Sequence, residues 1–418
     1  MKDADSSVDS ERFNSQRKLM LFDLSIRGHH PGYIQHLVRY WCDKELPGRL
    51  HIVVSPKFMQ EHSNVVSLSP SCNQRNVTFM AIAPEEEAAL RSRKNSINRT
   101  FRAFQEWQLF CKYADLLKAT QCLIMYFDTC QLPLAFGARP TCPFSGIYFK
   151  PTFHYDEFAT YVPSWKERPQ RWREKLLLSR VLGHPQLKTL FCLDPFVVKH
   201  IDKPQNRVRA VHLPDPVETH SNLQFQMEKL REKLGIHSER QVFVLFGALT
   251  DRKGIYQLLE AVLTLSPTLC QKLCLLLVGE SRIEASLKSR IAEICQSRPI
   301  QIIGRYEFIP EQDVQAYFQL ADVVLAPYQR HVGMSGILML AAAAQKPVLS
   351  SNYGLMGEVV QRYRLGLTVD STVPNEIAKG LTRFLLESPA GLCDRTKMKH
   401  FASQNSAEEF ASVIFQCV

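Results

Sequence analysis

The sequence lacks any apolar run long enough to span a bilayer, and its start lacks the apolar core of a signal peptide. Residues 1–17 are polar and charged, so we expect a disordered leader there and a cytoplasmic protein. The 12 cysteines stand singly and form no CxxC pair, which argues against a zinc site. We expect reduced thiols, because a large cytosolic protein has no need of disulfides.

Several motifs that mark nucleotide and nucleic-acid chemistry are also absent. There is no GxxxxGK[ST] loop and no GxGxxG after a strand, which argues against a P-loop NTPase and a nicotinamide-dependent enzyme. The net charge of +10 suits a polyanionic substrate, an anionic membrane or nucleic acid, although a solvated basic surface also explains it. Because no zinc-finger spacing, RNP-like motif or Arg-rich tract is present, we expect no nucleic-acid partner.

Strands and helices alternate in two blocks along the 418 residues, a length that exceeds what one hydrophobic core usually supports. Apolar runs predict strands in the first block at 18–25, 51–54, 77–82, 122–127, 146–149 and 189–192. Those of the second block lie at 242–249, 274–278, 300–303, 323–326 and 348–350. This alternation predicts an α/β fold with two doubly wound parallel sheets, whose ligands bind beyond the carboxyl ends of the strands, in the cleft between the domains. The Pro-rich segment 213–216 separates a first domain, 18–215, from a second, 216–400.

The stretch 242–254, VFVLFGALTDRKG, is the most informative part of the chain. Its apolar run is typical of a buried parallel strand, and it ends in a polar turn with Arg252, Lys253 and Gly254. Helical spacing begins directly afterwards, at Ile255. Backbone N–H groups at the start of a helix, with two cations beside them, predict a binding site for an anion.

A second turn of this kind is Gly333-Met334-Ser335-Gly336, which leads into an Ala-rich helix. Gly333 and Gly336 allow a ligand to approach the backbone closely, and Ser335 adds a hydroxyl donor. Arg252 taken alone is explained by a solvated cation in a loop. Two anion-binding turns in one domain instead favour a diphosphate.

The segments FGALTDRKGIYQLLEAV, LLLVGE, ADVVLAPY, VGMSGILMLAAAAQKPVLSS and GLMGEVVQRYRLGLTVD follow one another over most of residues 240–370. Together they resemble the donor domain of a GT-B glycosyltransferase of the family 4, or group 1, type. The first half of the chain is similar in organisation only. The resemblance implies two Rossmann-like domains facing a central cleft, with the last helical segment, 401–418, packed back on the first domain.

The resemblance also implies an activity, the transfer of a sugar from a nucleotide-diphosphate-sugar donor to an acceptor hydroxyl, with retention and without a metal or cofactor. In that family the two cations after the first donor-domain strand bind the diphosphate, and here these are Arg252 and Lys253. They would stabilise the negative charge that grows on the leaving phosphate. The only DxD run, Asp3-Ala4-Asp5, lies in the polar leader, which argues against a manganese-dependent GT-A enzyme. The acceptor stays open between a glycan, a lipid-linked molecule and a small molecule.

Two positions depart from the family pattern. The family carries two glutamates, eight positions apart, where this chain has Val332 and Leu340, and the second glutamate normally holds the nucleotide ribose. A leucine cannot do so, which leaves two alternatives to transfer: a non-catalytic GT-B protein that binds a nucleotide sugar or a partner, and a sugar-nucleotide epimerase. Gly354 and Glu358 do match a later family pattern near the nucleotide, although Glu358 also suits a carboxylate favoured by a helix dipole.

The first domain offers three candidate catalytic residues. Gly28, His29 and His30 lie in the loop after the first strand, where a histidine can bind a phosphate or hydroxyl or transfer a proton. Turn chemistry and local hydrogen bonding are the alternative for both histidines. We assign Gly28 to donor binding, and His29 and His30 to catalysis. Asp128 follows a buried strand, at a position that often projects into the cleft, and is the third candidate, although a retaining enzyme can rely on the leaving phosphate itself.

Residues 164–182, SWKERPQRWREKLLLSRVL, form a basic segment with aromatic residues on one helical face. Trp165, Trp172 and Leu176 share that face, among Lys and Arg side chains. Such a helix can lie on an anionic membrane as a peripheral contact. Alternatively its aromatic face packs on the first domain, which we favour because Pro169 interrupts the pattern.

Overall fold

The computed structural model describes residues 17–69, 76–91, 95–159, 161–165, 167–217 and 224–418, so nearly all of the predicted leader lies outside the described residues. The chain divides into two compact units. The first unit comprises Met1–His154, Pro163–Pro216 and Ala407–Val418, and the second comprises Tyr155–Val162 and Val217–Ser406. The main boundary therefore lies one residue beyond the predicted one. Residues 155–162, which we expected in the first domain, join the second unit.

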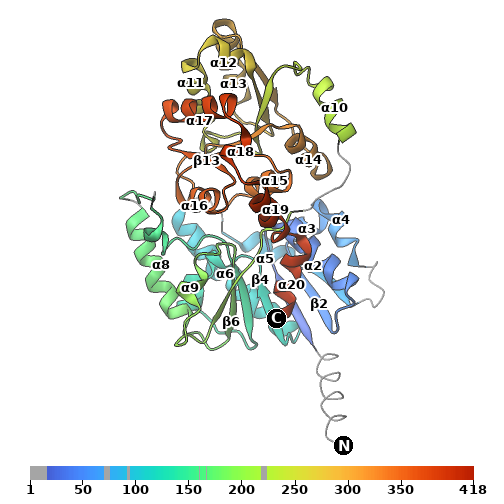
Figure 1. Cartoon of the computed structure of the whole chain (residues 1–418). Coiled ribbons are helices and arrows are strands. Elements are labelled where there is room, and N and C mark those ends of the chain that lie inside the picture. Colours follow the sequence, from blue (N-terminus) through green and yellow to red (C-terminus); the bar gives the residue numbers. More distant parts are fainter. Residues whose placement is uncertain (1–16, 70–75, 92–94, 160, 166, 218–223) are drawn as a thin grey trace, which may run out of the picture. The chain divides into compact units, whose positions relative to one another are not determined.

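The first unit is built on a parallel sheet of seven strands (Figure 1). In sheet order they are β3 (Val77–Ala81), β2 (Arg49–Val54), β1 (Lys18–Phe22), β4 (Gln121–Ile124), β5 (Phe144–Tyr148), β6 (Leu187–Cys192) and β7 (Arg209–His212). The apolar pattern misses β7, because only Ala210 of its residues is fully buried. The order reverses at β1, which pairs with β2 on one side and β4 on the other. The loops after β1 and β4 therefore diverge at a switch point, the place where such sheets bind ligands.

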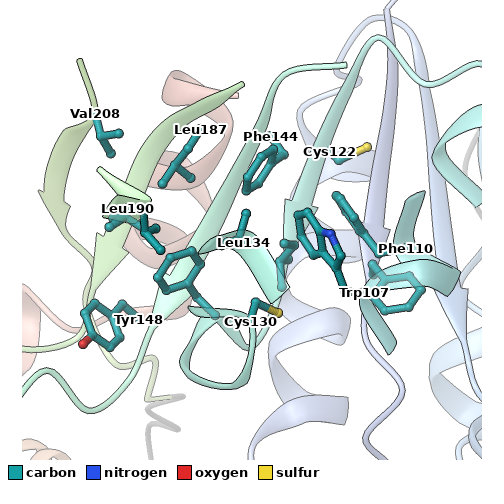
Figure 2. Packing of buried hydrophobic residues seen from close by; sticks show 14 of the residues in the cluster. Trp107, Phe110, Cys122, Cys130, Leu134, Phe144, Tyr148, Leu187, Leu190 and Val208 are labelled. Carbon is teal, nitrogen blue, oxygen red and sulfur yellow. The ribbon is translucent and has the colours of Figure 1, made fainter. Parts of the chain in front are cut away.

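Helices cover both faces of this sheet (Figure 1). They are α2 (His30–Asp43), α3 (Pro56–Glu61), α4 (Ser63–Val66), α5 (Pro84–Ala89), α6 (Ser96–Leu116), α7 (Gln131–Phe136), α8 (Glu167–Val181), α9 (Val198–Ile201) and α20 (Ala407–Cys417), with a 3₁₀ turn η2 (Phe127–Thr129). Side chains alternate along β1, so Leu19 and Leu21 join a core with α2 and α20, whereas Met20 joins the core under α6. Figure 2 shows that second core, where the rings of Trp107 and Phe110 stack at 5.0 Å between centroids.

The last helix, α20, belongs to the first unit and lies beside α2 (Figure 1). It buries Phe410 and Ile414, and its Phe415 meets the ring of Trp41 at 5.3 Å between centroids. Each such side chain contributes about 1.5–3 kcal/mol when it leaves water, so α20 is an integral part of the first core. The helix begins later than the predicted segment, and residues 401–406 remain with the second unit.

Helix α8 turns its aromatic residues to solvent. Trp172 is 69% exposed and Leu176 is 43% exposed. Its buried side chains are Arg171, Leu177, Leu178 and Val181. The expectation that the aromatic face packs on the first domain is therefore wrong, because the leucines one position further along the helix fill that contact. Lys166, which we counted with this helix, lies outside the described residues.

The second unit carries a parallel sheet of six strands. In sheet order they are β10 (Gln301–Arg305), β9 (Leu273–Val278), β8 (Gln241–Phe246), β11 (Val323–Ala326), β12 (Val348–Ser351) and β13 (Gly366–Val369). The order reverses at β8, which pairs with β9 and with β11. Two doubly wound parallel sheets confirm the predicted fold class, and they place a second switch point at the ends of β8 and β11.

The helices of the second unit are α10 (Gln224–Lys233), α11 (Ile255–Thr264), α12 (Pro267–Lys272), α13 (Glu284–Ser297), α14 (Glu311–Leu320), α15 (Ile337–Ala343), α16 (Gly354–Arg362), α17 (Pro374–Leu386), α18 (Pro389–Leu392) and α19 (Arg395–Ser403). Two 3₁₀ turns, η3 (Tyr155–Glu157) and η4 (Asp251–Lys253), complete it. Within the described part of the chain, none of the helices combines the length and the apolar character that crossing a membrane requires.

Most of the described cysteines are free thiols, and the majority of these are buried. Cys42 is the exception, because it is disulfide-bonded. The expectation that all cysteines are reduced is therefore wrong at this residue. Cys122 and Cys142, with 3.4 Å between their sulfur atoms, are an unbonded pair within the core of the first unit.

Candidate functional site

The predicted phosphate turn follows β8 as the 3₁₀ turn η4 and leads into α11. Gly254 joins the two with a φ of +72°. A Cβ on Gly254 would overlap the carbonyl oxygen of Pro327, which belongs to the loop after β11. In that loop the backbone N–H of Gln329 donates to the carbonyl of Arg252 at 2.8 Å. Glycine at position 254 thus lets the loops after β8 and β11 meet at the switch point.

Lys253 is a buried cation within this turn. Its residue is 6% exposed, and Nζ donates to the carbonyl oxygen of Phe246 at 2.9 Å and to the hydroxyl of Tyr328. Nζ also lies 4.2 Å from the centre of the Tyr328 ring. Among the described residues, no carboxylate forms an ion pair with Lys253. A buried ammonium with neutral partners keeps its charge available for an anion.

Tyr328 connects the two predicted turns. Its hydroxyl lies 3.2 Å from Ser335 Oγ, so Lys253, Tyr328 and Ser335 form a continuous hydrogen-bonded row. Arg252 lies beside the same ring, with its guanidinium carbon 5.8 Å from the ring centre and Nη1 3.3 Å from His331 Nδ1. The structure therefore brings the predicted cations and Ser335 together. Sequence reasoning did not assign Tyr328 to the site, although it stands two residues after β11 and ends the segment ADVVLAPY that carries part of the family resemblance.

The loop with Gly333, Ser335 and Gly336 leads into α15, as the sequence predicts. Gly336 has a φ of −55°, which any residue adopts. A Cβ there would meet no atom within 4 Å. The fold therefore does not need glycine at Gly336, and open space lies at the start of α15, one residue from the Ser335 hydroxyl.

Glu358 lies in α16, and its carboxylate forms an ion pair with Arg362 one turn later. This ion pair is a sufficient reason for a glutamate at position 358. Neither contact with a nucleotide nor the helix dipole is needed to explain it. Val332 lies in the loop after β11, where its carbonyl accepts from the backbone N–H of Leu355 at 3.3 Å. Leu340 is half-buried in α15. Neither side chain at 332 or 340 offers a hydrogen bond to a ribose.

The loop after β1, in the first unit, carries an acid–base pair. His30 Nδ1 is 2.6 Å from Asp23 Oδ2, and Asp23 Oδ1 accepts from the backbone N–H of Ser25 at 2.9 Å. Gly28 turns the chain between the two with a φ of +73°. Asp23 fixes the orientation of the imidazole through Nδ1, and in the neutral tautomer with its proton on Nδ1 the free Nε2 is an acceptor. Sequence reasoning missed Asp23, because the strand was predicted to continue to residue 25.

His29 lies among aromatic rings. Its ring centroid is 4.5 Å from that of Phe149, 4.5 Å from that of His30 and 4.8 Å from that of Tyr33. His29 keeps an exposed edge, and the partial loss of water around its imidazole lowers its pKa to about 3, with the charges of His30 and Lys150 acting in the same direction. His29 is therefore neutral at physiological pH, so it can exchange hydrogen bonds but supplies no positive charge.

Asp128 lies in η2, after β4, and both of its oxygens are occupied. They accept the backbone N–H groups of Phe149 and Lys150, each at 2.9 Å. Burial raises the pKa of Asp128 to about 6, although the two N–H donors act in the opposite direction. These contacts hold Phe149 against His29. They support a positioning role for Asp128, rather than the contact with a reacting group that we expected.

A pocket of about 430 Å³ opens at the switch point of the first sheet. Asp23 and His30 line it, together with residues that follow β4 and one face of α6. All lining residues belong to the first unit. The first unit therefore combines the acid–base pair with a hollow of ligand size.

Comparison with known proteins gives a family match in the second unit and a likeness of fold over nearly the whole chain. Residues 226–405 match the family model described as glycosyl transferases group 1. An uncharacterized glycosyltransferase of Methanocaldococcus jannaschii is 26% identical over 190 residues, which are 44% of this chain and 46% of that protein. The chain thus aligns with less than half the length of this curated relative.

Two solved structures extend the likeness to nearly the whole chain. HepE of Anabaena, in complex with UDP-glucose, superposes with a TM-score of 0.61 at 13% identity, over 96% of this chain and 100% of that one. Sucrose-phosphate synthase of Thermosynechococcus elongatus superposes with a TM-score of 0.63 at 16% identity, over 96% of this chain and 98% of that one. At such identities the likeness concerns the fold. The chain therefore has the GT-B fold of these proteins, and residues 226–405 match the glycosyl transferases group 1 family model.

Proposed function

We propose that this protein is a glycosyltransferase that moves a sugar from a nucleotide-diphosphate-sugar donor to an acceptor hydroxyl, with retention of configuration and no metal ion. The observation that carries the proposal is the buried ammonium of Lys253, held by Tyr328 beside Arg252 and paired with no carboxylate among the described residues. The family match over the second unit supports it. HepE, a protein of the same fold, is known in complex with UDP-glucose, which supports a nucleotide sugar as the ligand.

The two cations serve the diphosphate. During transfer the bond from the sugar C1 to the diphosphate oxygen breaks, a bond from the acceptor oxygen forms on the same face, and the hydroxyl proton passes to the diphosphate. Lys253 and Arg252 stabilise the charge that develops on the leaving oxygen, with Ser335 as a further donor. Because protein cations supply this stabilisation, the step requires no metal.

The histidine loop contributes from the first unit. His30, fixed by Asp23, accepts a hydrogen bond from a hydroxyl through Nε2. His29, which is neutral, exchanges hydrogen bonds with the sugar. Gly28 leaves space for a ligand to approach its backbone, since a Cβ there would meet no atom within 4 Å.

Donor hydrolysis and transfer test this function. UDP-, GDP- and ADP-glucose are each incubated with the protein, and proton NMR follows the anomeric signals. We expect turnover of at least one donor, with the α-anomer formed from the α-linked donor. Arg252→Ala and Lys253→Ala should each weaken donor binding and hydrolysis. Wild-type donor affinity and hydrolysis in both variants would show that the assigned roles are wrong.

A second candidate function is a GT-B protein that binds a nucleotide sugar or a protein partner without catalysis. Val332 and Leu340, where the family carries glutamates, favour it, and Glu358 is already paired with Arg362. In that case calorimetry would detect nucleotide binding, while no donor and acceptor combination gives turnover. Product formation with any donor would exclude this candidate.

We further propose a cytoplasmic protein that contacts an anionic membrane peripherally through α8. Trp172 and Leu176 are exposed, and the guanidinium of Arg180 lies 5.3 Å from the centre of the exposed Phe136 ring. The exposed cations of the helix are Arg168, Arg173, Lys175 and Arg180. Aromatic rings suit the headgroup layer, and each cation near anionic lipid contributes about 1 kcal/mol.

Vesicle co-sedimentation tests the membrane contact. We expect binding to phosphatidylcholine vesicles that contain phosphatidylserine, and weaker binding to pure phosphatidylcholine. The double substitution Trp172→Ala with Leu176→Ala should reduce binding, whereas Phe308→Ala, at an equally exposed aromatic residue of the second unit, should not. Equal binding of wild type and the double variant would contradict the contact.

A further inference from the structure

The pocket of the first unit combines aromatic side chains with two arginines that form no ion pair with any described residue. Its volume of about 430 Å³ suits a ligand of monosaccharide size rather than a polymer. It lies at the ends of β1 and β4, where the strand order reverses. The position and size are those of a site for a small molecule.

The wall of the pocket is rigid and apolar. Trp107 and Phe110 stack on one another from α6 (Figure 2), and both are almost fully buried. The indole N–H of Trp107 donates to the carbonyl of Ala138 at 2.7 Å, which fixes the ring. Tyr126 and Ile124 continue the wall after β4. These buried rings close the floor of the pocket. Tyr126, which is half-buried and whose ring centroid lies 5.6 Å from that of His30, offers the surface on which the apolar face of a sugar ring can pack.

The charges around the pocket do not cancel. Glu106 is bonded to Arg102, with 2.6 Å between Oε1 and Nε, and Asp23 is bonded to His30. Arg27 and Arg99 also line the pocket and are exposed. Within the described part of the chain, neither of their side chains forms an ion pair or hydrogen bond. Two cations therefore remain for a ligand, and an arginine fork matches a phosphate or carboxylate.

We propose that this pocket binds the acceptor, and that the acceptor is a small hydroxylated molecule with a phosphate or carboxylate group, such as a sugar phosphate or a sugar acid. Arg27 and Arg99 bind the anionic group, the half-buried ring of Tyr126 packs against the sugar ring, and His30 Nε2 accepts a hydrogen bond from the reactive hydroxyl. The assignment rests on the proposed transferase function, and it selects the small molecule among the acceptors that the sequence leaves open.

Isothermal titration calorimetry, without any donor, tests the pocket directly. The probes are glucose 6-phosphate, glucuronate and glucose. We expect at least one anionic probe to bind about tenfold or more tightly than glucose, because a hydrogen bond to a charged group is worth that much or more. The preferred anion distinguishes phosphate from carboxylate. Added salt should weaken the anionic probe and leave glucose unchanged.

Substitutions of Arg27 and Arg99 test whether these two side chains bind the anionic probe. Arg27→Ala and Arg99→Ala should each weaken the preferred anion about tenfold, and Arg99→Lys should restore part of the loss. Arg209→Ala, at an exposed arginine on β7 of the same unit, is the matched control and should bind as wild type. Anionic probes that bind no better than glucose, or wild-type affinity in the double Arg27→Ala, Arg99→Ala variant, would overturn the proposal.

Donor hydrolysis on the same samples separates this proposal from the proposed function. Hydrolysis depends on Lys253 and requires no acceptor, so it is measured on the wild-type protein and on the control Arg209→Ala, which should hydrolyse the donor at the same rate. If the wild-type protein hydrolyses a donor but binds no anionic probe better than glucose, the acceptor assignment alone is overturned. Selective anion binding that depends on Arg27 and Arg99, without hydrolysis of any donor, supports the pocket and contradicts the transferase.

Discussion

Lys253 Nζ donates to the hydroxyl of Tyr328, although the two residues stand 75 positions apart on loops that follow different strands. The bond keeps a buried ammonium at the point where the second sheet reverses its strand order. Tyr328 in turn reaches Ser335 in the loop before α15. One hydroxyl thus organises both of the turns that the sequence identifies as anion-binding.

Replacing the ammonium tests its role. Lys253→Met keeps the length of the side chain and removes the charge, so we expect donor hydrolysis to fall about 10²–10³-fold, as for loss of one charge-stabilising donor. The free energy of unfolding is measured alongside, because the variant removes a buried cation and also loses the hydrogen bonds to Phe246 and Tyr328, which act in opposite directions. Lys272→Met, at an exposed lysine of α12, is the control and should leave both properties unchanged. Undiminished hydrolysis in Lys253→Met would contradict the assignment.

The hydroxyl of Tyr328 should matter apart from its ring. Tyr328→Phe keeps the ring over which Lys253 lies and removes the bond to both Lys253 and Ser335. We expect nucleotide affinity to fall about tenfold and the free energy of unfolding to fall by about 1–3 kcal/mol, as for a lost buried hydrogen bond. Calorimetric titration and urea unfolding measure the two effects. If the Ser335→Ala and Tyr328→Phe variants both bind the nucleotide with wild-type affinity, the hydrogen-bonded row of Lys253, Tyr328 and Ser335 has no part in nucleotide binding.

Two glycines of the second unit should differ in their tolerance of alanine. Gly254→Ala meets a left-handed backbone and the carbonyl of Pro327, so it should lower the free energy of unfolding by at least about 2 kcal/mol. Gly336→Ala meets open space and an ordinary φ, so its stability should stay within about 0.5 kcal/mol of wild type. Urea unfolding of the two variants checks this contrast, and equal destabilisation would contradict the packing of the two loops.

Asp128 should make stability depend on pH. Its pKa is about 6 in the folded protein, above the ordinary 3.8, so between these values the folded state holds a proton that the unfolded state has lost. The free energy of unfolding therefore falls as the pH rises from about 4 to about 6, by at most about 3 kcal/mol from this group, and is level above that range. Asp128→Asn removes the titration. We expect the stability advantage of wild type over the variant to shrink from pH 4 to pH 7. An advantage that does not change over this range would show that the carboxyl is not perturbed.

The fold could be predicted because its signals are local. The strands β8 and β9 are continuous apolar runs that only a buried parallel sheet accommodates, and the cationic turn after β8 is contiguous in sequence. The strand β7 was not predicted, because its side chains are mostly half-exposed and its apolar pattern is therefore weak.

The contacts within the sites could not be predicted in the same way. Asp23 meets His30 only because the loop after β1 turns back, and Tyr328 meets Lys253 only because β8 and β11 are neighbours in the sheet. Helical spacing shows that Trp172 and Leu176 share a face, but it does not show whether another element covers that face. Each of these depends on tertiary packing, which periodicity does not encode.

A crystal structure with the nucleoside diphosphate that binds most tightly among UDP, GDP and ADP tests the central claim most directly. The account predicts phosphate oxygens within hydrogen-bonding distance of Lys253 Nζ and the Arg252 guanidinium, at the ends of β8 and β11. A diphosphate bound elsewhere on the protein, with Lys253 still bonded only to Phe246 and Tyr328, would contradict it.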